Sequence, residues 1–208
     1  MVARRRLWTV IERRLLFFGD SFVAGMGDPQ GRGWVGRVVE AAAEAAVTVT
    51  PYNLGVRGET SVEVADRWWG EAESRVVAGA DCRVVVAVGA NDPLDPRVSP
   101  AASRRALESI LVTAAELGLG TFVVGPGPVG EPTIDERVLA LDDAFVALCA
   151  ELEVPYVPVA RALMDDAAWT GEAEAFDGTH PGAGGYTTLA DLVLAAGFLD
   201  WLRANGAS

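Results

Sequence analysis

Short apolar runs alternate with longer amphipathic stretches along the chain. The runs have the length and the apolar or β-branched content of buried strands, and they span residues 15–19, 47–55, 82–89, 121–125 and 155–159. The longer stretches have a helical composition, and they span residues 33–46, 61–77, 99–118, 133–152 and 186–204. This alternation predicts an α/β fold, in which a parallel sheet of about five strands is covered by helices on both faces.

One of these helical stretches carries clear signals for its start and its end. Ser99 followed by Pro100 is typical of a helix start, and Gly118 is typical of a helix end. Between them, Leu107 and Leu111 lie one helical turn apart on the same face. We therefore expect a helix that begins near Ser99 and ends near Gly118.

The chain of 208 residues has the length of one compact domain. Its first residues, MVARRRLWTVIERR, are basic at the start, as a signal peptide is. The apolar stretch after Arg6 nevertheless ends at Ile11, because Glu12 interrupts it, and it is too short for a signal sequence. We therefore expect residues 1–14 to form an N-terminal extension and residues 15–208 to form a single domain.

Charge and cysteine content narrow the classes of partner. The formal net charge is −12 at pH 7, which argues against nucleic acid and anionic membrane surfaces as partners. No apolar run approaches the ~20 residues that span a bilayer, so no integral membrane association is expected. Cys82 and Cys149 have no CxxC spacing and indicate neither a disulfide framework nor a metal site. These features favour a cytoplasmic protein, and they leave its oligomeric state open.

Four loops at predicted strand ends carry polar or glycine-rich clusters, and binding sites of parallel sheets form at such ends. The loops are FFGDSFVAG, NLGVRGETS, VGANDP and FDGTHPG. Each has a purely structural interpretation. Ser21 could cap a helix, Gly58 could allow a positive φ angle, and Asn91 could stabilise a turn. His180, the only histidine of the chain, could be an ordinary loop residue.

Together the four loops contain the parts of a serine hydrolase. The hydroxyl of Ser21 becomes a nucleophile only if a base takes its proton, and His180 is the one imidazole available. Asp177, three residues before it, can accept the Nδ1–H of that imidazole. The backbone N–H groups of Ser21 and Gly58 and the side-chain amide of Asn91 could stabilise an oxyanion. This set predicts acyl transfer at the carboxyl edge of the sheet.

The motifs GDSF, GVRGET, GAND and DGTHPG, in this order, resemble the four signature blocks of the SGNH hydrolases, the GDSL esterase/lipase superfamily. The matching residues are Ser21, Gly58, Asn91 and His180, with Asp177 as the third member of the triad. The resemblance implies a flavodoxin-like, three-layer α/β/α sandwich. It also implies hydrolysis of esters or thioesters without a metal or an organic cofactor. The α/β-hydrolase fold is not indicated, since no serine lies in a G-x-S-x-G motif.

The resulting hypothesis is a serine esterase that hydrolyses short-chain or acetyl esters of small molecules through an acyl-enzyme. An acyltransferase or a thioesterase on the same triad is the alternative. A non-catalytic flavodoxin-like binding module is a more distant one. Trp169 and Phe176 lie shortly before the histidine loop and are candidate pocket residues. Asp20 and Asp92 are expected to be structural, because a carboxylate is a poorer base than imidazole for a serine proton at neutral pH.

Overall fold

The computed structural model describes residues 13–204 and contains one five-stranded, all-parallel sheet. The strand order is β2-β1-β3-β4-β5, the order of flavodoxin-like folds. The strands are β1 (Arg13–Gly19), β2 (Val49–Gly55), β3 (Asp81–Ala87), β4 (Gly120–Val124) and β5 (Tyr156–Val157). The predicted fold class is thereby confirmed.

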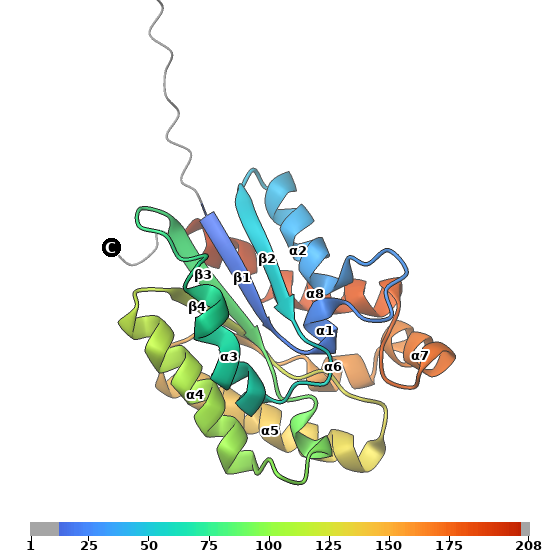
Figure 1. Ribbon diagram of the computed structural model, residues 1–208. Helices are drawn as coiled ribbons and strands as arrows, with labels where there is room; N and C mark the ends of the chain where they lie inside the picture. The colour runs from blue at the N-terminus through green and yellow to red at the C-terminus, as the bar shows by residue number, and fades with distance from the viewer. Residues whose placement is uncertain (1–12, 205–208) are drawn as a thin grey trace, which may run out of the picture.

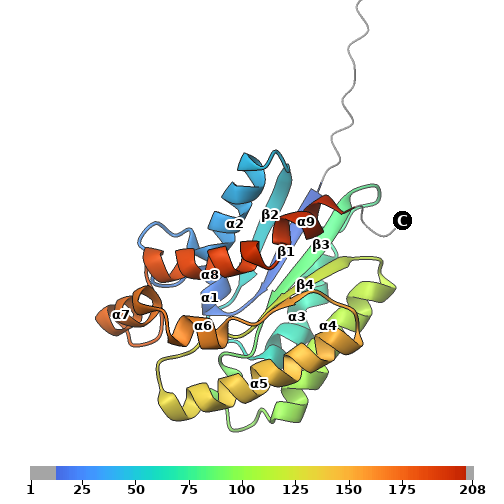
Figure 2. The same ribbon diagram turned by 180° about the vertical axis from the view of Figure 1, so that it is seen from behind.

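Helices cover both faces of the sheet (Figures 1 and 2). One face is covered by α2 (Gly33–Glu44), α8 (Ala183–Ala195) and α9 (Phe198–Arg203). The other face is covered by α3 (Ser61–Ala72), α4 (Pro100–Glu116) and α5 (Pro132–Glu151). The side chain of Ser99 caps α4 by accepting from the N–H of Ala102 at 3.2 Å, as its position before Pro100 predicts.

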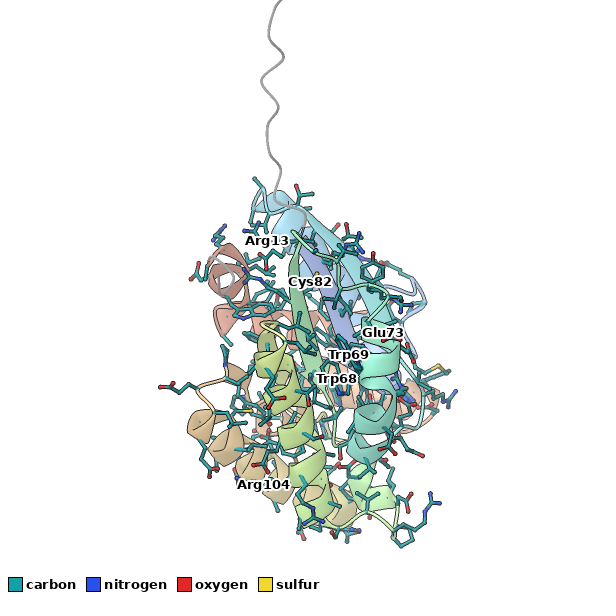
Figure 3. All side chains as sticks on the ribbon, turned by 60° about the vertical axis from the view of Figure 1, so that its left-hand side comes forward. Arg13, Trp68, Trp69, Glu73, Cys82 and Arg104 are labelled. Carbon is teal, nitrogen blue, oxygen red and sulfur yellow. The ribbon has the colours of Figure 1, made fainter. Side chains whose placement is uncertain are left out.

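The central strand β1 divides the core into two halves because successive side chains of a strand point to opposite faces. Phe17 packs on the α2 side, where its ring meets Trp34 edge to face at 5.7 Å. Phe18 packs on the α3 side against Trp68 at 6.2 Å. Figure 3 shows Trp68 and its neighbour Trp69 on α3. The continuous apolar run of β1 therefore reflects burial on both faces.

Strand register brings three of the four polar loops together. Gly19, the last residue of β1, is paired with Gly55 of β2 on one side and with Ala87 of β3 on the other. The chain segments that follow these residues therefore leave the sheet at the same level. The strand order also reverses direction between β1 and β3, and open α/β sheets bind ligands in the crevice at such a point.

Two features differ from the expected element boundaries. The first strand begins at Arg13, two residues before the expected domain start, and Arg13 is paired with Asp81 of β3 at 3.0 Å. The remainder of the expected extension, residues 1–12, lies outside the described residues. The stretch 186–204 forms two helices, α8 and α9, because Gly197 takes a left-handed conformation at φ 89° between them.

Two helices near the carboxyl edge had no counterpart in the sequence pattern. They are α6 (Ala160–Met164) and α7 (Ala167–Phe176). Asp166 caps α7 by accepting from the N–H of Trp169 at 2.7 Å. The periodic signal of α7 is weak, since Trp169 and Ala173 are its only buried residues. This helix leads directly into the histidine loop.

Candidate active site

Ser21 opens α1 (Ser21–Ala24), a single turn of helix that follows β1 directly. Asp20 caps this turn, and its Oδ1 accepts from the N–H of Phe22 at 2.9 Å. The carbonyl of Asp20 accepts from the N–H of Ala24 at 3.0 Å. Within residues 13–204, the backbone N–H of Ser21 donates to no other group. It is therefore available to a ligand at the carboxyl edge of the sheet.

His180 connects Ser21 to Asp177. Its Nε2 lies 2.8 Å from the Oγ of Ser21, and its Nδ1 lies 2.7 Å from the Oδ2 of Asp177. The imidazole is buried, and the ring of Phe22 packs 5.5 Å from it. If Nδ1 carries the proton that Asp177 accepts, Nε2 is free to accept the hydroxyl proton of Ser21. The structure thus brings the three residues into one hydrogen-bonded chain.

The loop from Asp177 to His180 folds back on its own carboxylate. Oδ1 of Asp177 accepts from the N–H groups of Thr179 at 3.1 Å and His180 at 2.9 Å. Burial raises the pKa of Asp177, but the hydrogen bonds from His180 and from the N–H of Thr179 outweigh it and hold that pKa at about 2. The carboxylate therefore stays ionised at neutral pH and can orient the imidazole. The hydroxyl of Thr179 anchors the loop by donating to the carbonyl of Val129 at 3.0 Å.

Gly58 lies in a tight turn after β2. The turn is closed by a hydrogen bond of 3.3 Å from the N–H of Glu59 to the carbonyl of Val56, and Gly58 has a φ of 83°, which favours glycine. In the part of the chain that the structure describes, the N–H of Gly58 donates to no other group. Thr60 then begins α3 with a capping box that it forms with Glu63. This arrangement leaves a second backbone donor free at the carboxyl edge of the sheet.

Asn91 connects the three loops through its side-chain amide. Its Nδ2 donates to the carbonyl of Glu59 at 2.9 Å and to Oδ2 of Asp20 at 3.3 Å. Both amide hydrogens are therefore engaged, in contrast to the free backbone N–H groups of Ser21 and Gly58. The bond to Asp20 is the longer one, so it is the one that an incoming oxyanion could replace most easily.

Asp20 and Asp92 hold the loops in place. Burial, together with the nearby charges of Asp92 and Glu59, raises the pKa of Asp20 to about 7, although the N–H of Phe22 opposes the shift. Asp92 opens a 3₁₀ turn and accepts from the N–H of Ser61 at 2.7 Å and from its hydroxyl at 2.5 Å. Because both carboxylates contact other loop groups, neither is placed as the base of Ser21.

A carboxylate from α7 holds the first turn of α8, the helix that follows the histidine loop. Oε1 of Glu172 accepts from the N–H of Gly184 at 3.0 Å, and Oε2 accepts from that of Gly185 at 2.8 Å. The two helices are so close that a Cβ on Gly185 would lie 2.8 Å from the Cα of Trp169. Negative charge suits a helix N-terminus because its N–H groups have no partner within the helix. Sequence reasoning missed Glu172 because no local motif connects it to α8.

The substitution Glu172→Gln is expected to lower the free energy of unfolding by about 1–2 kcal/mol. Glutamine keeps one acceptor oxygen but turns an NH₂ group toward the second backbone N–H. Denaturant titration measures the change. Glu174→Gln is the matched control, since Glu174 is exposed on the same helix and its side chain forms no hydrogen bond with the rest of the described chain. Equal unfolding midpoints for the two variants would contradict the role given to Glu172.

A cavity of about 500 Å³ borders the histidine loop on the side of α7. Gly178 and Thr179 form part of its wall, and Trp169 forms another part. Trp169 is only 2% exposed, and its ring packs 5.2 Å from that of Phe22. The other candidate pocket residue, Phe176, is 56% exposed and does not line this cavity. The two aromatic residues therefore lie in different environments.

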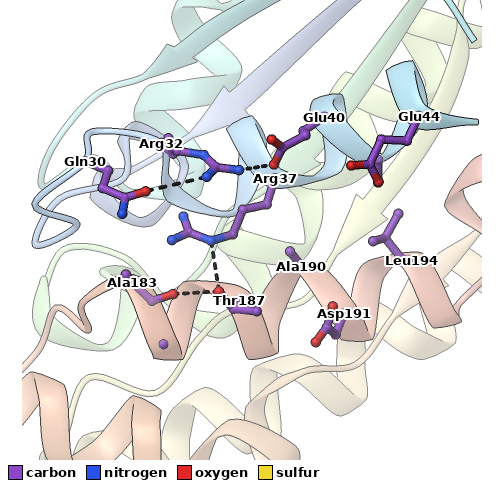
Figure 4. A pocket seen from close by; sticks show the side chains of 12 residues that line it. Gln30, Arg32, Arg37, Glu40, Glu44, Ala183, Thr187, Ala190, Asp191 and Leu194 are labelled. Atoms are coloured by element: carbon purple, nitrogen blue, oxygen red, sulfur yellow. Dashed lines mark hydrogen bonds and ion pairs between the residues drawn. The ribbon is translucent and has the colours of Figure 1, made fainter.

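A second cavity, of about 550 Å³, lies between α2 and α8 (Figure 4). Its two arginines already have partners. Arg32 is paired with Glu40, while Arg37 is paired with Asp28 at 2.6 Å and donates to the hydroxyl of Thr187 at 3.0 Å. The positive charges of this cavity are therefore neutralised by the protein itself.

Metal and thiol chemistry have no assembled site in the described part of the chain. Between residues 13 and 204, no three His, Cys, Asp or Glu side chains form a group that could hold a metal ion. Cys82 and Cys149 are buried free thiols, and burial raises the pKa of Cys149 to about 12. Within residues 13–204, no helix is long and apolar enough to cross a membrane. A reaction without a metal or an organic cofactor stays a prediction.

Solved structures of several hydrolases share this fold. Axe2, an acetylxylan esterase from Geobacillus stearothermophilus, is 20% identical, with 94% of this chain and 100% of that chain covered and a TM-score of 0.73. TesA is 23% identical, with 89% and 99% covered and a TM-score of 0.73. A lipase/acylhydrolase from Enterococcus faecalis is 22% identical, with 94% and 99% covered and a TM-score of 0.73. At these identities the likeness demonstrates the fold.

The family is identified by the sequence itself. A search of curated proteins finds no significant match. The model of the GDSL-like lipase/acylhydrolase family matches residues 17–188, which include the loops of Ser21, Gly58, Asn91 and His180. The resemblance of the four motifs is thereby confirmed. The chain belongs to the GDSL-like lipase/acylhydrolase family and is a serine hydrolase that acts on ester bonds.

Proposed function

We propose that the protein hydrolyses short-chain or acetyl esters of small molecules, with Ser21 as nucleophile, His180 as general base and acid, and Asp177 as the residue that orients the imidazole. The observation that carries the proposal is the continuous hydrogen-bonded chain from Ser21 Oγ through the imidazole to Asp177, with distances of 2.8 and 2.7 Å. Nucleophile and base lie within the reach that proton transfer requires.

The first half of the reaction forms an acyl-enzyme. Oγ of Ser21 attacks the carbonyl carbon of the ester while Nε2 of His180 takes the hydroxyl proton. The carbonyl oxygen becomes an oxyanion and accepts from the free N–H groups of Ser21 and Gly58. When the intermediate collapses, the bond to the alcohol breaks, and the leaving oxygen receives the proton from Nε2. Asp177, ionised because its pKa is about 2, stabilises the transient imidazolium.

The second half of the reaction releases the acid. A water molecule gives a proton to Nε2 of His180 and attacks the acyl carbonyl, and the proton then returns to Oγ of Ser21 as the carboxylic acid leaves. Asn91 is the proposed third oxyanion donor. To serve in this way it exchanges its bond of 3.3 Å to Asp20 for a bond to the oxyanion, while the bond to the carbonyl of Glu59 holds the amide in place.

The preference for a short acyl group rests on the room around the nucleophile. Ser21 and His180 are both buried. The cavity of about 500 Å³ is lined by the histidine loop at Gly178 and Thr179, but not by Ser21 or His180. That cavity therefore borders the histidine loop without being lined by the reacting groups. The structural neighbour Axe2 is an acetylxylan esterase. The acetyl group is a small acyl group, which agrees with the proposed preference.

A fluorophosphonate probe tests the proposed nucleophile. It phosphonylates a serine only when a base activates the hydroxyl and an oxyanion site receives the phosphonyl oxygen. We expect one covalent adduct, located on Ser21 by peptide mass spectrometry and absent from Ser21→Ala. Ser103→Ala is the control, because Ser103 is a buried serine on α4 whose hydroxyl donates to the carbonyl of Ser99, the N-cap of that helix, and this variant should label as the wild type does. An unlabelled wild-type protein, or an adduct on another serine, would refute the assignment.

A further inference from the structure

Arg57 lies between the turn of Gly58 and the triad. It occupies the turn position directly before Gly58, and its Nη2 lies 3.9 Å from Oδ2 of Asp177. Its Nη1 lies 3.7 Å from the sulfur of Met26. Among the residues that the structure describes, it is the only arginine within 4.0 Å of a triad carboxylate. A positive charge therefore lies beside the reacting groups.

The hydrogen-bonding capacity of Arg57 is largely unused. Its side chain is 61% exposed, and a separation of 3.9 Å from Asp177 is too long for a hydrogen bond. Arg67, on the following helix, shows the contrast: it contacts Glu59 at 2.6 Å and also donates to the carbonyl of Leu54 at 2.8 Å. A guanidinium offers five N–H donors in a planar fork that matches a carboxylate. Most of the fork of Arg57 is therefore open to solvent.

The acidic groups near the site do not compete for Arg57. Asp20 contacts Phe22 and Asn91, and both oxygens of Asp177 accept hydrogen bonds within the histidine loop. The bond of 2.7 Å from His180 to Asp177 is much shorter than the contact from Arg57, so the guanidinium can turn away without disturbing the triad. An anionic group on a bound ester would then meet an exposed guanidinium that makes no close hydrogen bond to a carboxylate of the protein.

We propose that Arg57 is a specificity residue that binds a carboxylate carried by the ester substrate, on its acyl or its alcohol part. The inference rests on the proposed function and names its substrate class: monoesters of dicarboxylic acids, or esters of hydroxy acids. The guanidinium forms charge-assisted hydrogen bonds with that carboxylate while the ester carbonyl lies at the N–H groups of Ser21 and Gly58. It takes no part in bond making or breaking.

Matched ester pairs test the proposal. In the first pair, mono-p-nitrophenyl adipate carries a terminal carboxylate on its acyl part where p-nitrophenyl hexanoate has a methyl group. In the second pair, 4-acetoxybenzoate carries a carboxylate on its alcohol part and phenyl acetate does not. Selectivity is the ratio of kcat/KM for the charged ester to that for the neutral one. For at least one pair, Arg57→Gln should lower selectivity about tenfold, mainly through KM, with Arg57→Lys in between. Arg203→Gln on α9, which removes the same charge far from the site, should leave selectivity as in the wild type.

The outcomes separate this inference from the proposed function. If Arg57→Gln changes the charged and neutral esters of both pairs by the same factor, Arg57 supports the triad rather than the substrate, and the inference is wrong. A wild-type selectivity that is insensitive to added salt would also contradict it, because an exposed charge pair is screened. If wild-type protein hydrolyses none of the four esters, the proposed function fails first. If the protein hydrolyses the neutral esters and Ser21→Ala abolishes this activity, the proposed function holds. The comparison of charged with neutral esters then tests Arg57 alone.

Discussion

Replacing Ser21 with alanine is expected to lower kcat for ester hydrolysis by about 10⁴- to 10⁶-fold, because removing the nucleophile of a catalytic triad leaves only binding and oxyanion stabilisation. The loss should be in kcat rather than in KM, since the N–H groups of Ser21 and Gly58 remain. The substitution removes only the hydroxyl and leaves the backbone hydrogen bonds around α1 in place, so the fold should persist. Steady-state kinetics on p-nitrophenyl acetate, with circular dichroism of both proteins, measures the two effects.

Ser109→Ala serves as the control for this experiment. Ser109 lies on α4, and its hydroxyl donates to the carbonyl of Ala106 at 2.8 Å, so the change removes a similar bond far from the triad. That variant should keep wild-type kcat. If Ser21→Ala retained most of its activity while folded, the nucleophile would have to be another group, and the proposed mechanism would be lost.

Replacing Asp177 with asparagine is expected to lower kcat by about 10⁴-fold, as it does when a triad aspartate is amidated elsewhere. Asparagine can still accept from the N–H groups of Thr179 and His180 through its oxygen. Its NH₂ group then faces Nδ1 of His180 and favours the tautomer with the proton on Nε2, which cannot accept the proton of Ser21. The wild-type carboxylate, with a pKa of about 2, stays ionised above pH 4, so the difference should persist across that range.

The single histidine makes this prediction directly visible. In the wild type, the proton shared by Nδ1 of His180 and Asp177 should give a far-downfield, nitrogen-bound proton resonance, and no other imidazole is present to produce one. Asp177→Asn should abolish that resonance. Asp200→Asn, an exposed position on α9, should retain both the resonance and the activity. Retention of the resonance in Asp177→Asn would show that another acceptor orients the imidazole.

Much of the architecture was predictable because it follows from local pattern. A strand buried on both faces must be apolar at every position, as residues 15–19 are, and the amphipathic stretches between such strands must cover the sheet. The four motifs were equally readable, since a parallel sheet brings loops after adjacent strands to one edge. Gly197 shows the limit of such a prediction. A glycine inside an apolar helical pattern is tolerated in many helices, but in this structure Gly197 takes a φ of 89° and separates α8 from α9.

The sequence alone was enough to predict a parallel sheet of about five strands with helices on both faces, the four polar loops at its strand ends, and His180 as the only possible imidazole base. The contacts that those side chains form became known only from the folded structure. It paired Glu172 with the start of α8, engaged both amide hydrogens of Asn91, and placed the exposed guanidinium of Arg57 3.9 Å from Asp177. These outcomes depend on distances between segments far apart in the chain. Periodicity and motif spacing carry no information about such distances, which packing alone sets.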